Sequence, residues 1–166
     1  ESLMFHPGQA FQIAATTLVG QSLGAKDPDT AERCGWQTRN IGVVVALGIA
    51  LFLFFFGRYA ALLYTADQTV INLSAGSLRI VAVAQPFLVT ALVLIGGLRG
   101  AGDTRWPMYI TFAGIWGFRV LVGYILALRV GMGLAGAWTG MAVDMVVRAI
   151  LVSWRFKTGH WKTGKV

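Results

Sequence analysis

The stretch "NIGVVVALGIALFLFFFG", from Asn40 to Gly57, decides the fold because it contains no charged side chain and a long apolar run. A helix needs roughly 20 apolar residues to cross a hydrocarbon layer about 30 Å thick. Together with the mostly apolar residues that follow it, the run has the length of a membrane-spanning helix. We therefore predict a transmembrane helix at residues 41–64.

Four further stretches have the same character. Residues 2–25 and 80–98 contain no charge, and the stretches 106–128 and 130–154 contain three charges between them. Hydrophobic residues make up 56% of the chain and charged residues 13%, whereas about a quarter of a soluble domain is charged. We therefore predict an all-α, polytopic membrane protein with about five transmembrane helices. The predicted spans are residues 7–25, 41–64, 80–98, 107–128 and 133–154, and a basic tail follows at 155–166.

The distribution of positive charge predicts the orientation of these helices. The net charge is +7, and cytoplasmic loops of membrane proteins carry an excess of Lys and Arg. When alternate loops are assigned to one side, nine positive residues fall there and three fall on the other side. We therefore predict a multi-pass protein of the plasma membrane, in bacteria the inner membrane, with the first loop, the loop near residue 100 and the C-terminus in the cytoplasm. The nine are Lys26, Arg33, Arg39, Arg99, Arg105, Arg155, Lys157, Lys162 and Lys165, and the three are Arg58, Arg79 and Arg129.

Other residue types argue against several classes of function. The single cysteine, Cys34, cannot form an internal disulfide. His6 and His160 have no companions at metal-ligand spacing, so we expect neither a metal site nor a cofactor. An enzyme would need a convergent set of nucleophile, base or metal ligands at one depth, and the spans offer none. The chain begins at Glu1 without a positively charged leader, so we expect the C-terminal part of a longer protein.

The first span carries a polar stripe. At about 100° per residue, Gln9, Gln12, Thr16 and Gly20 fall on one face of a helix. Such a face turns away from lipid, either because it lines a cavity open to water or because its side chains bond neighbouring helices that Gly allows to approach closely. The sequence leaves both interpretations open. We take Gln9, Gln12 and Thr16 as candidates for a substrate cavity.

The third span contains a polar residue next to a helix breaker. Gln85 is the fourth candidate for the cavity, and Pro86 follows it directly. Proline removes one backbone hydrogen bond and can kink a helix. Pro86 is therefore a candidate hinge, and the alternative is a static bend.

Three ionisable residues lie inside the last two spans. Buried charge in a membrane costs at least a few kcal/mol unless it is paired. At 1.5 Å per residue, Arg119 lies about 14 Å and Asp144 about 17 Å from the outer end of the last hairpin. We therefore predict that Arg119 pairs with Asp144 across the hairpin, with Arg148 able to join one turn deeper. The pair would lock two helices together, or take part directly in ion coupling or substrate binding. On the last span, the small residues Gly136 and Gly140 predict close helix packing.

The stretch "GLRGAGDT", from Gly97 to Thr104, is close to a phosphate-binding loop. That loop places Lys after its second glycine, whereas this chain has Asp103, whose carboxylate would repel phosphate. We therefore exclude nucleotide binding. The glycines from 96 to 102 predict a compact turn, and Thr104 is placed to cap the next helix.

Two stretches carry a resemblance to a known family. "GLRGAGDTRWPM", from Gly97 to Met108, resembles the loop after the fourth helix of each six-helix half in multidrug and toxic compound extrusion (MATE) transporters. "PGQAFQIAATTLVGQSLGAKDPDTAER", from Pro7 to Arg33, resembles the second helix of such a half and the cytoplasmic segment after it. This resemblance implies that the chain covers helices eight to twelve of a twelve-helix transporter, which is most of one six-helix bundle.

The resemblance also implies a function. Such transporters export amphipathic, often cationic compounds in exchange for H⁺ or Na⁺ while two bundles rock about a central cavity. The sodium-coupled branch has acids in helices seven and ten, but the segment 80–98, which corresponds to helix ten, has none. We therefore expect the coupling ion, H⁺ or Na⁺, to bind outside this chain. The expected partners are a small-molecule substrate, the lipid bilayer and the N-terminal half of the same transporter, with no nucleic acid.

Two alternative functions remain open. A lipid-linked oligosaccharide flippase of the same superfamily would carry anionic cargo, which favours several Arg residues in its cavity. A structural membrane subunit would have no water-lined face on its first span. Cysteine labelling along residues 9–20 separates a cavity from inert packing.

Overall fold

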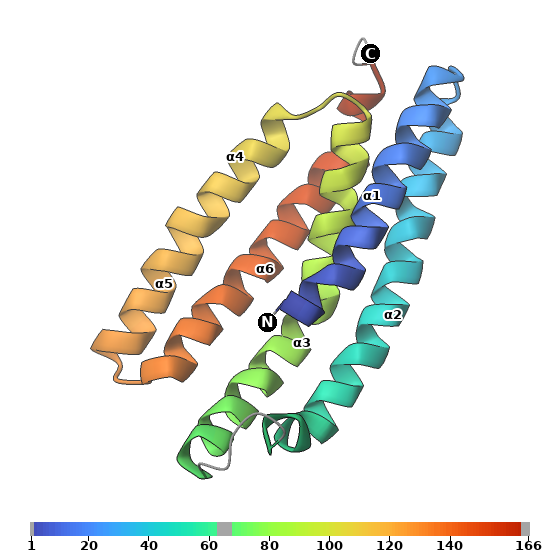
Figure 1. Ribbon diagram of the computed structural model, residues 1–166. Coiled ribbons are helices and arrows are strands. Elements are labelled where there is room, and N and C mark those ends of the chain that lie inside the picture. The colour runs from blue at the N-terminus through green and yellow to red at the C-terminus, as the bar shows by residue number, and fades with distance from the viewer. Residues whose placement is uncertain (1, 63–67, 164–166) are drawn as a thin grey trace.

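The computed structural model describes residues 2–62 and 68–163, and every regular element in these ranges is a helix (Figure 1). Three long helices come first: α1 (Ser2–Gly24), α2 (Pro28–Leu62) and α3 (Gln68–Gly100). A fourth rod is built from α4 (Arg105–Ala113), the π-helix η1 (Gly114–Val120), α5 (Leu121–Tyr124) and the π-helix η2 (Ile125–Arg129). The chain then forms α6 (Gly133–Lys157) and the short 3₁₀ helix η3 (His160–Thr163).

The prediction of an all-α membrane protein is confirmed. In the described residues, four helical stretches are long and apolar enough to cross a membrane, and α1 is not among them. The four are Pro28–Gly57, Gly76–Gly100, Arg105–Arg129 and Gly133–Lys157.

The helices form one bundle with α3 at its centre. Figure 1 shows α3 beside α1, α2 and α6, while the fourth rod packs against α6. In the membrane-length stretch of α3, 56% of the residues are buried, against 22% in α2 and 17% in the fourth rod. The loop after α1, the loop after α3 and the C-terminal segment lie at one end, which we call the tail end (Figure 1). The side chains of Arg58 and Lys165, which belong to the charge count, lie outside the described residues.

The start of α2 differs from the prediction. The second span, predicted to begin at residue 41, is part of one continuous helix that begins at Pro28, a residue tolerated in the first turn. Asp27 caps it, because its Oδ1 accepts a hydrogen bond from the backbone N–H of Thr30 at 3.0 Å. Hydrogen bonds from the Thr30 side chain and backbone lower the pKa of Asp27.

The prediction of a glycine-rich turn is wrong for most of its glycines. Gly96 and Gly100 are helical residues of α3, and only Gly102, with φ of +80°, lies in the turn in a left-handed conformation. A Cβ at Gly96 would collide with the carbonyl of Gln12, and one at Gly100 would collide with that of Thr16. The glycines thus allow α1 and α3 to touch along their backbones. Thr104 makes no side-chain cap, and Asp103 Oδ1 instead lies 3.4 Å from the backbone nitrogen of Trp106.

The fourth rod and α6 also pack through glycines. A Cβ at Gly140 would collide with the backbone of Gly123, and one at Gly136 would collide with Leu126 and Ala127. The predicted close packing by Gly136 and Gly140 is confirmed. The two π-helical segments lie in the rod that makes these contacts, and such segments occur frequently at functional sites.

Candidate functional site

The polar stripe of α1 faces α3 over much of its length. Thr16 Oγ1 lies 3.0 Å from the carbonyl oxygen of Gly96 and 2.9 Å from that of Gln12, and its hydroxyl donates to them. Gly20 packs against the carbonyl of Gly100. Thr16 and Gly20 therefore join two helices, which is the second of the two interpretations left open by the sequence.

The two glutamines of α1 are more accessible. Gln12 is half-buried, and Gln9 is exposed on the surface of the described bundle. Neither side chain is enclosed by the helices of this chain. Both can therefore contact a neighbouring part of a larger protein or water.

Gln85 lies in the core, where the sequence placed a cavity residue. Its relative exposure is only 2%, and its side-chain Nε2 has no hydrogen-bond partner in the described structure. Pro86 lies inside α3, which continues to Gly100. The hydroxyl of Thr90 donates to the carbonyl of Pro86 at 2.8 Å. Thus α3 carries a buried amide nitrogen without a hydrogen-bond partner next to Pro86, whose missing N–H interrupts the hydrogen bonds of the helix.

An apolar groove runs between α3 and α6. It has a volume of about 230 Å³, and we call it the α3–α6 groove. Sequence analysis did not find it, because residues of two helices far apart in the chain form it. Its lining residues are Val83, Ala84 and Phe87 of α3 with Thr139, Ala142, Val143, Val146 and Val147 of α6.

The intramembrane charges are arranged differently from the prediction. Arg148 Nε donates to Asp144 Oδ1 at 3.0 Å, and Arg148 Nη2 also contacts Asp144 Oδ2. The Asp144 side chain is only 1% exposed and that of Arg148 is 19% exposed. The predicted pairing of Asp144 with Arg148 is therefore present, and both residues belong to α6.

The predicted pair between Arg119 and Asp144 is wrong. Among the ion pairs of the described residues, Asp144 has Arg148 as its partner, and Arg119 is half-buried without an ion pair. A Cβ at Gly140 would lie 3.1 Å from the Arg119 carbonyl, which places Arg119 one turn away from Asp144. Gly114 is the residue of the fourth rod that lies against Asp144, since a Cβ there would collide with Asp144 Oδ1. The prediction assumed that Arg119 and Asp144 face each other because they lie at similar depth in straight helices, but the structure places Gly114 opposite Asp144.

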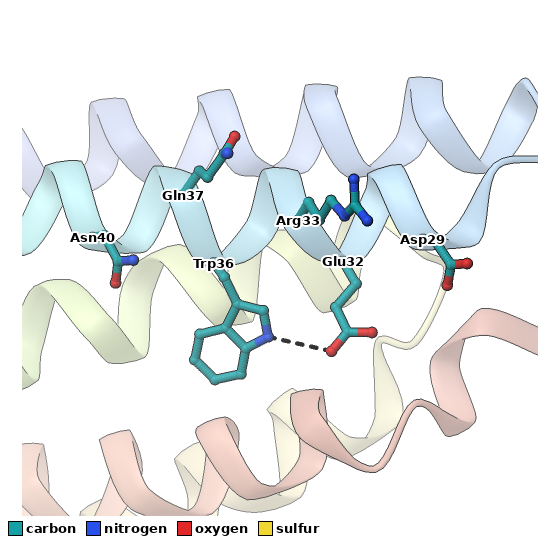
Figure 2. A pocket seen from close by; sticks show the side chains of 6 residues that line it. All are labelled: Asp29, Glu32, Arg33, Trp36, Gln37 and Asn40. Carbon is teal, nitrogen blue, oxygen red and sulfur yellow. Dashed lines mark hydrogen bonds between the residues drawn. The ribbon is translucent and has the colours of Figure 1, made fainter.

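A second hollow lies at the tail end of the bundle. It has a volume of about 380 Å³ and is lined by one face of α2, as Figure 2 shows. In Figure 2 the Trp36 indole N–H points to Glu32, to which it donates at 3.4 Å. Lys162 of the C-terminal segment forms ion pairs with Glu32 at 2.6 Å and with Asp29 at 3.2 Å. The hydrogen bond to Glu32 raises the pKa of Lys162. The lining residues are Asp29, Glu32, Arg33, Trp36, Gln37 and Asn40.

The C-terminal segment is part of the core at the tail end. Trp161 is 2% exposed, and its indole N–H donates to the carbonyl of Phe156 at 2.7 Å. Its ring stacks on that of Phe156, which also makes a T-shaped contact with the ring of Trp36. Arg155 Nη2 pairs with Asp103 Oδ2 at 2.8 Å, which joins α6 to the loop after α3. The basic composition of residues 155–166 gave no signal of this packing.

Three comparisons relate this chain to known proteins. The MatE family model matches residues 1–125. The chain is 32% identical, over 98% of its length, to a NorM protein of Thermotoga maritima described as a probable multidrug resistance protein. It is 35% identical, over 99% of its length, to the NorM protein of Burkholderia vietnamiensis, described as a multidrug resistance protein. The structure superposes on the eukaryotic MATE transporter AtDTX14 with a TM-score of 0.90 at 23% identity, over 97% of this chain and 36% of that one. The chain spans about a third of the length of the curated relatives that it matches, 35% and 36% in the two NorM proteins.

Proposed function

The chain belongs to the MatE family of transporters, and we propose that it forms most of one six-helix bundle of a secondary antiporter that exports amphipathic or cationic compounds in exchange for H⁺ or Na⁺. The family is one of transporters, so the chain is not an enzyme. The observation that carries the proposal is the fold. Membrane-length helices pack as one bundle and superpose closely on a MATE transporter.

The packing of the bundle supports a rocking mechanism. Alternating access in repeat-built transporters is largely a rigid-body movement of one bundle against the other. Backbone contacts at Gly96 and Gly100 hold α1 to α3, and those at Gly136 and Gly140 hold the fourth rod to α6. A bundle joined in this way is suited to move as one body. The rest of the transporter would supply the opposite bundle.

The two glutamines of α1, Gln9 and Gln12, are the proposed contacts with the cavity. Gln9 is exposed and Gln12 is half-buried at the surface of this bundle, where the opposite bundle and the substrate would lie. Thr16 is assigned to the contact between α1 and α3 because its hydroxyl is used there. We keep the main coupling site for H⁺ or Na⁺ outside this chain, as the absence of acids from residues 80–98 suggests.

The proposed location is the bacterial inner membrane with the tail end in the cytoplasm. Lys26, Arg99, Arg105, Lys157 and Lys162 lie at or next to the tail end, and an excess of positive residues is typical of the cytoplasmic side. The same orientation would place the C-terminus in the cytoplasm.

One observation favours a second candidate function. Arg119 lies half-buried within a membrane-length stretch, and it has no ion pair among the described residues. An anionic cargo, such as that of a lipid-linked oligosaccharide flippase, would provide its counter-charge. Export of organic cations that does not depend on Arg119 would argue against this candidate.

The proposed function is tested by expressing the full-length transporter in bacteria that lack their own drug exporters. Cells with the transporter should accumulate less ethidium, and an uncoupler that removes the ion gradients should abolish the difference. A version without residues 1–166 is the matched control. Equal ethidium accumulation with and without the transporter would contradict the proposal for this class of compound.

A further inference from the structure

The hollow at the tail end, which we call the tail-end hollow, takes no part in the proposed export function (Figure 2). Its walls combine opposite charges, since Asp29 and Glu32 lie beside Arg33. Gln37 and Asn40 add two amides, each of which both donates and accepts hydrogen bonds. The tail-end hollow therefore suits a ligand that carries both a positive and a negative charge.

Two of the charged side chains in the hollow can take a further partner. The side chain of Asp29 is 84% exposed, although Lys162 contacts its Oδ1. Arg33 is exposed and has no ion pair among the described residues. Glu32, in contrast, is already bonded to both Lys162 and Trp36. Asp29 and Arg33 thus offer an acceptor and a donor about one turn apart on α2.

The exposed part of this lining continues along α2 as one stripe, which we call the α2 stripe. At about 100° per residue, its members fall within about 40° of a single line along the helix. All of them are exposed on the described bundle, and the apolar ones are 46–69% exposed. The α2 stripe consists of Asp29, Arg33, Gln37, Asn40, Val44, Leu47, Leu51 and Phe55.

The order of groups along the α2 stripe is the order of groups in a phospholipid. From the start of the helix come an acid, an arginine, two amides and then apolar side chains. A phospholipid with an ethanolamine headgroup presents an ammonium, a phosphate, ester oxygens and acyl chains in the same direction. The apolar part, from Val44 to Phe55, is about 16 Å long, close to half of a hydrocarbon layer about 30 Å thick. The stripe therefore has the length and polarity of one lipid in the leaflet at the tail end.

The charges favour a headgroup with an ammonium over one with a phosphate alone. Arginine binds a phosphate through charge-assisted hydrogen bonds, so Arg33 fits the phosphate of either kind of lipid. A lipid without an ammonium would place its negative charge near Asp29 and offer that carboxylate no donor. Trp36 lines the hollow, and tryptophan is enriched at the level of lipid headgroups. The guanidinium of Arg39 lies 4.7 Å from the centre of the Trp36 ring and adds positive charge at this level.

We propose that the tail-end hollow and the α2 stripe bind one molecule of a phospholipid whose phosphate carries a primary amine. Arg33 and Gln37 donate hydrogen bonds to the phosphate, and Asp29 accepts one from the ammonium. The acyl chains lie along the apolar part of the stripe. The whole lipid is the ligand, because a headgroup alone would leave that part uncovered. This lipid is a bound partner of the protein and is distinct from the exported compounds.

Native mass spectrometry of the purified full-length transporter tests the proposal with three lipids that share the same acyl chains. Phosphatidylcholine has a phosphate and an ammonium without N–H groups, and phosphatidylglycerol has no ammonium. Wild type should bind phosphatidylethanolamine about tenfold more tightly than either, as expected for one hydrogen bond to a charged group. Asp29→Asn should weaken only phosphatidylethanolamine, down to the level of phosphatidylcholine. Arg33→Gln should weaken all three lipids about tenfold, because each has a phosphate.

Two controls accompany these variants. Arg105→Gln removes an exposed arginine that starts another membrane-length stretch and lies outside the tail-end hollow, so it should leave all three affinities unchanged. The melting temperatures of Asp29→Asn and Arg33→Gln should equal that of wild type, because exposed charges contribute little to stability. Glycerophosphoethanolamine, the headgroup without acyl chains, should not displace the bound lipid. A bimane label on Leu51→Cys should be quenched by lipids with brominated chains.

Three results would overturn the lipid site. The first is equal binding of the three lipids by wild type, or a preference for phosphatidylethanolamine that survives in both Asp29→Asn and Arg33→Gln. The second is displacement of the lipid by glycerophosphoethanolamine at similar concentrations, which would assign the hollow to a soluble molecule. The third is no quenching at Leu51→Cys, which would show that another part of the transporter covers the stripe. None of these measurements requires transport, so their failure is distinct from a failure of the proposed export function.

Discussion

Asp144 is paired with Arg148, which lies four residues further along the same helix, with Nε and Oδ1 3.0 Å apart. The pair therefore does not tie α6 to the fourth rod. Pairs at this spacing contribute only about 0.2–0.5 kcal/mol to isolated helices, whereas each charge costs roughly 2.5–3.5 kcal/mol at the centre of a membrane helix. The pair makes the burial of two charges tolerable and is a weak source of stability.

This arrangement predicts opposite effects for single and double substitutions. Asp144→Asn leaves Arg148 buried without a counter-charge and should destabilise the full-length transporter by about 3–5 kcal/mol. Asp144→Leu with Arg148→Leu should restore the wild-type melting temperature or raise it. Thermal unfolding in detergent measures both. If the double variant is as unstable as the single one, the pair contributes more than mutual neutralisation. If Asp144→Asn folds normally but transport is lost, Asp144 acts in transport and has no structural role.

Gly114 leaves the space that the Asp144 carboxylate occupies. Gly114→Ala would place a methyl group against Asp144 Oδ1, so the fourth rod or the carboxylate must shift, at a cost of about 1–3 kcal/mol. Gly117→Ala, three residues later on the same rod, is the matched control, because a Cβ there meets nothing within 4 Å. We expect a lower melting temperature for the first variant and an unchanged or higher one for the second. Equal melting temperatures would show that the contact at Gly114 is not tight.

Trp161 is predicted to stabilise the tail end. Trp161→Ala removes a buried ring that stacks on Phe156 and should cost about 3–5 kcal/mol. Trp154→Ala removes a ring that is 60% exposed, and it should change stability by no more than about 0.5 kcal/mol. Melting temperature and the rate of trypsin cleavage near the C-terminus report the difference. Similar values for the two variants would mean that the tail contributes nothing to the bundle.

The proposed orientation predicts which loops are reachable from outside the cell. A single cysteine at Arg99, in a version without Cys34, should resist a membrane-impermeant maleimide in intact cells and react after the cells are opened. A cysteine at Arg129, at the opposite end of the bundle, should react in intact cells. The reverse pattern would invert the topology.

Much of the fold could be predicted from composition and spacing. A lipid environment favours uncharged runs of membrane length, so the runs 40–57 and 80–98 identified two membrane segments without tertiary information. The spacing of Gly136 and Gly140 also predicted their packing, because two helices can approach closely only where one face lacks side chains.

Other features depend on register between distant segments. The prediction for Arg119 assumed a straight α-helix, whereas its rod contains the π-helical segment η1 and presents Gly114 to Asp144 instead. A glycine such as Gly96 is common both in turns and at contacts between helices. Its role at the contact with α1 became visible only once the position of α1 was known. The burial of Trp161 arises from its contacts with Phe156, which local composition does not show.

The most direct test of the central claim is a measurement of ion–substrate exchange in vesicles. The full-length transporter is reconstituted in vesicles loaded with ethidium, and the movement of H⁺ and Na⁺ is recorded with dyes as ethidium leaves. An antiporter predicts that one of the two ions moves against the direction of ethidium, in proportion to the ethidium released. Ethidium release at the same rate with no opposing movement of either ion would contradict the account.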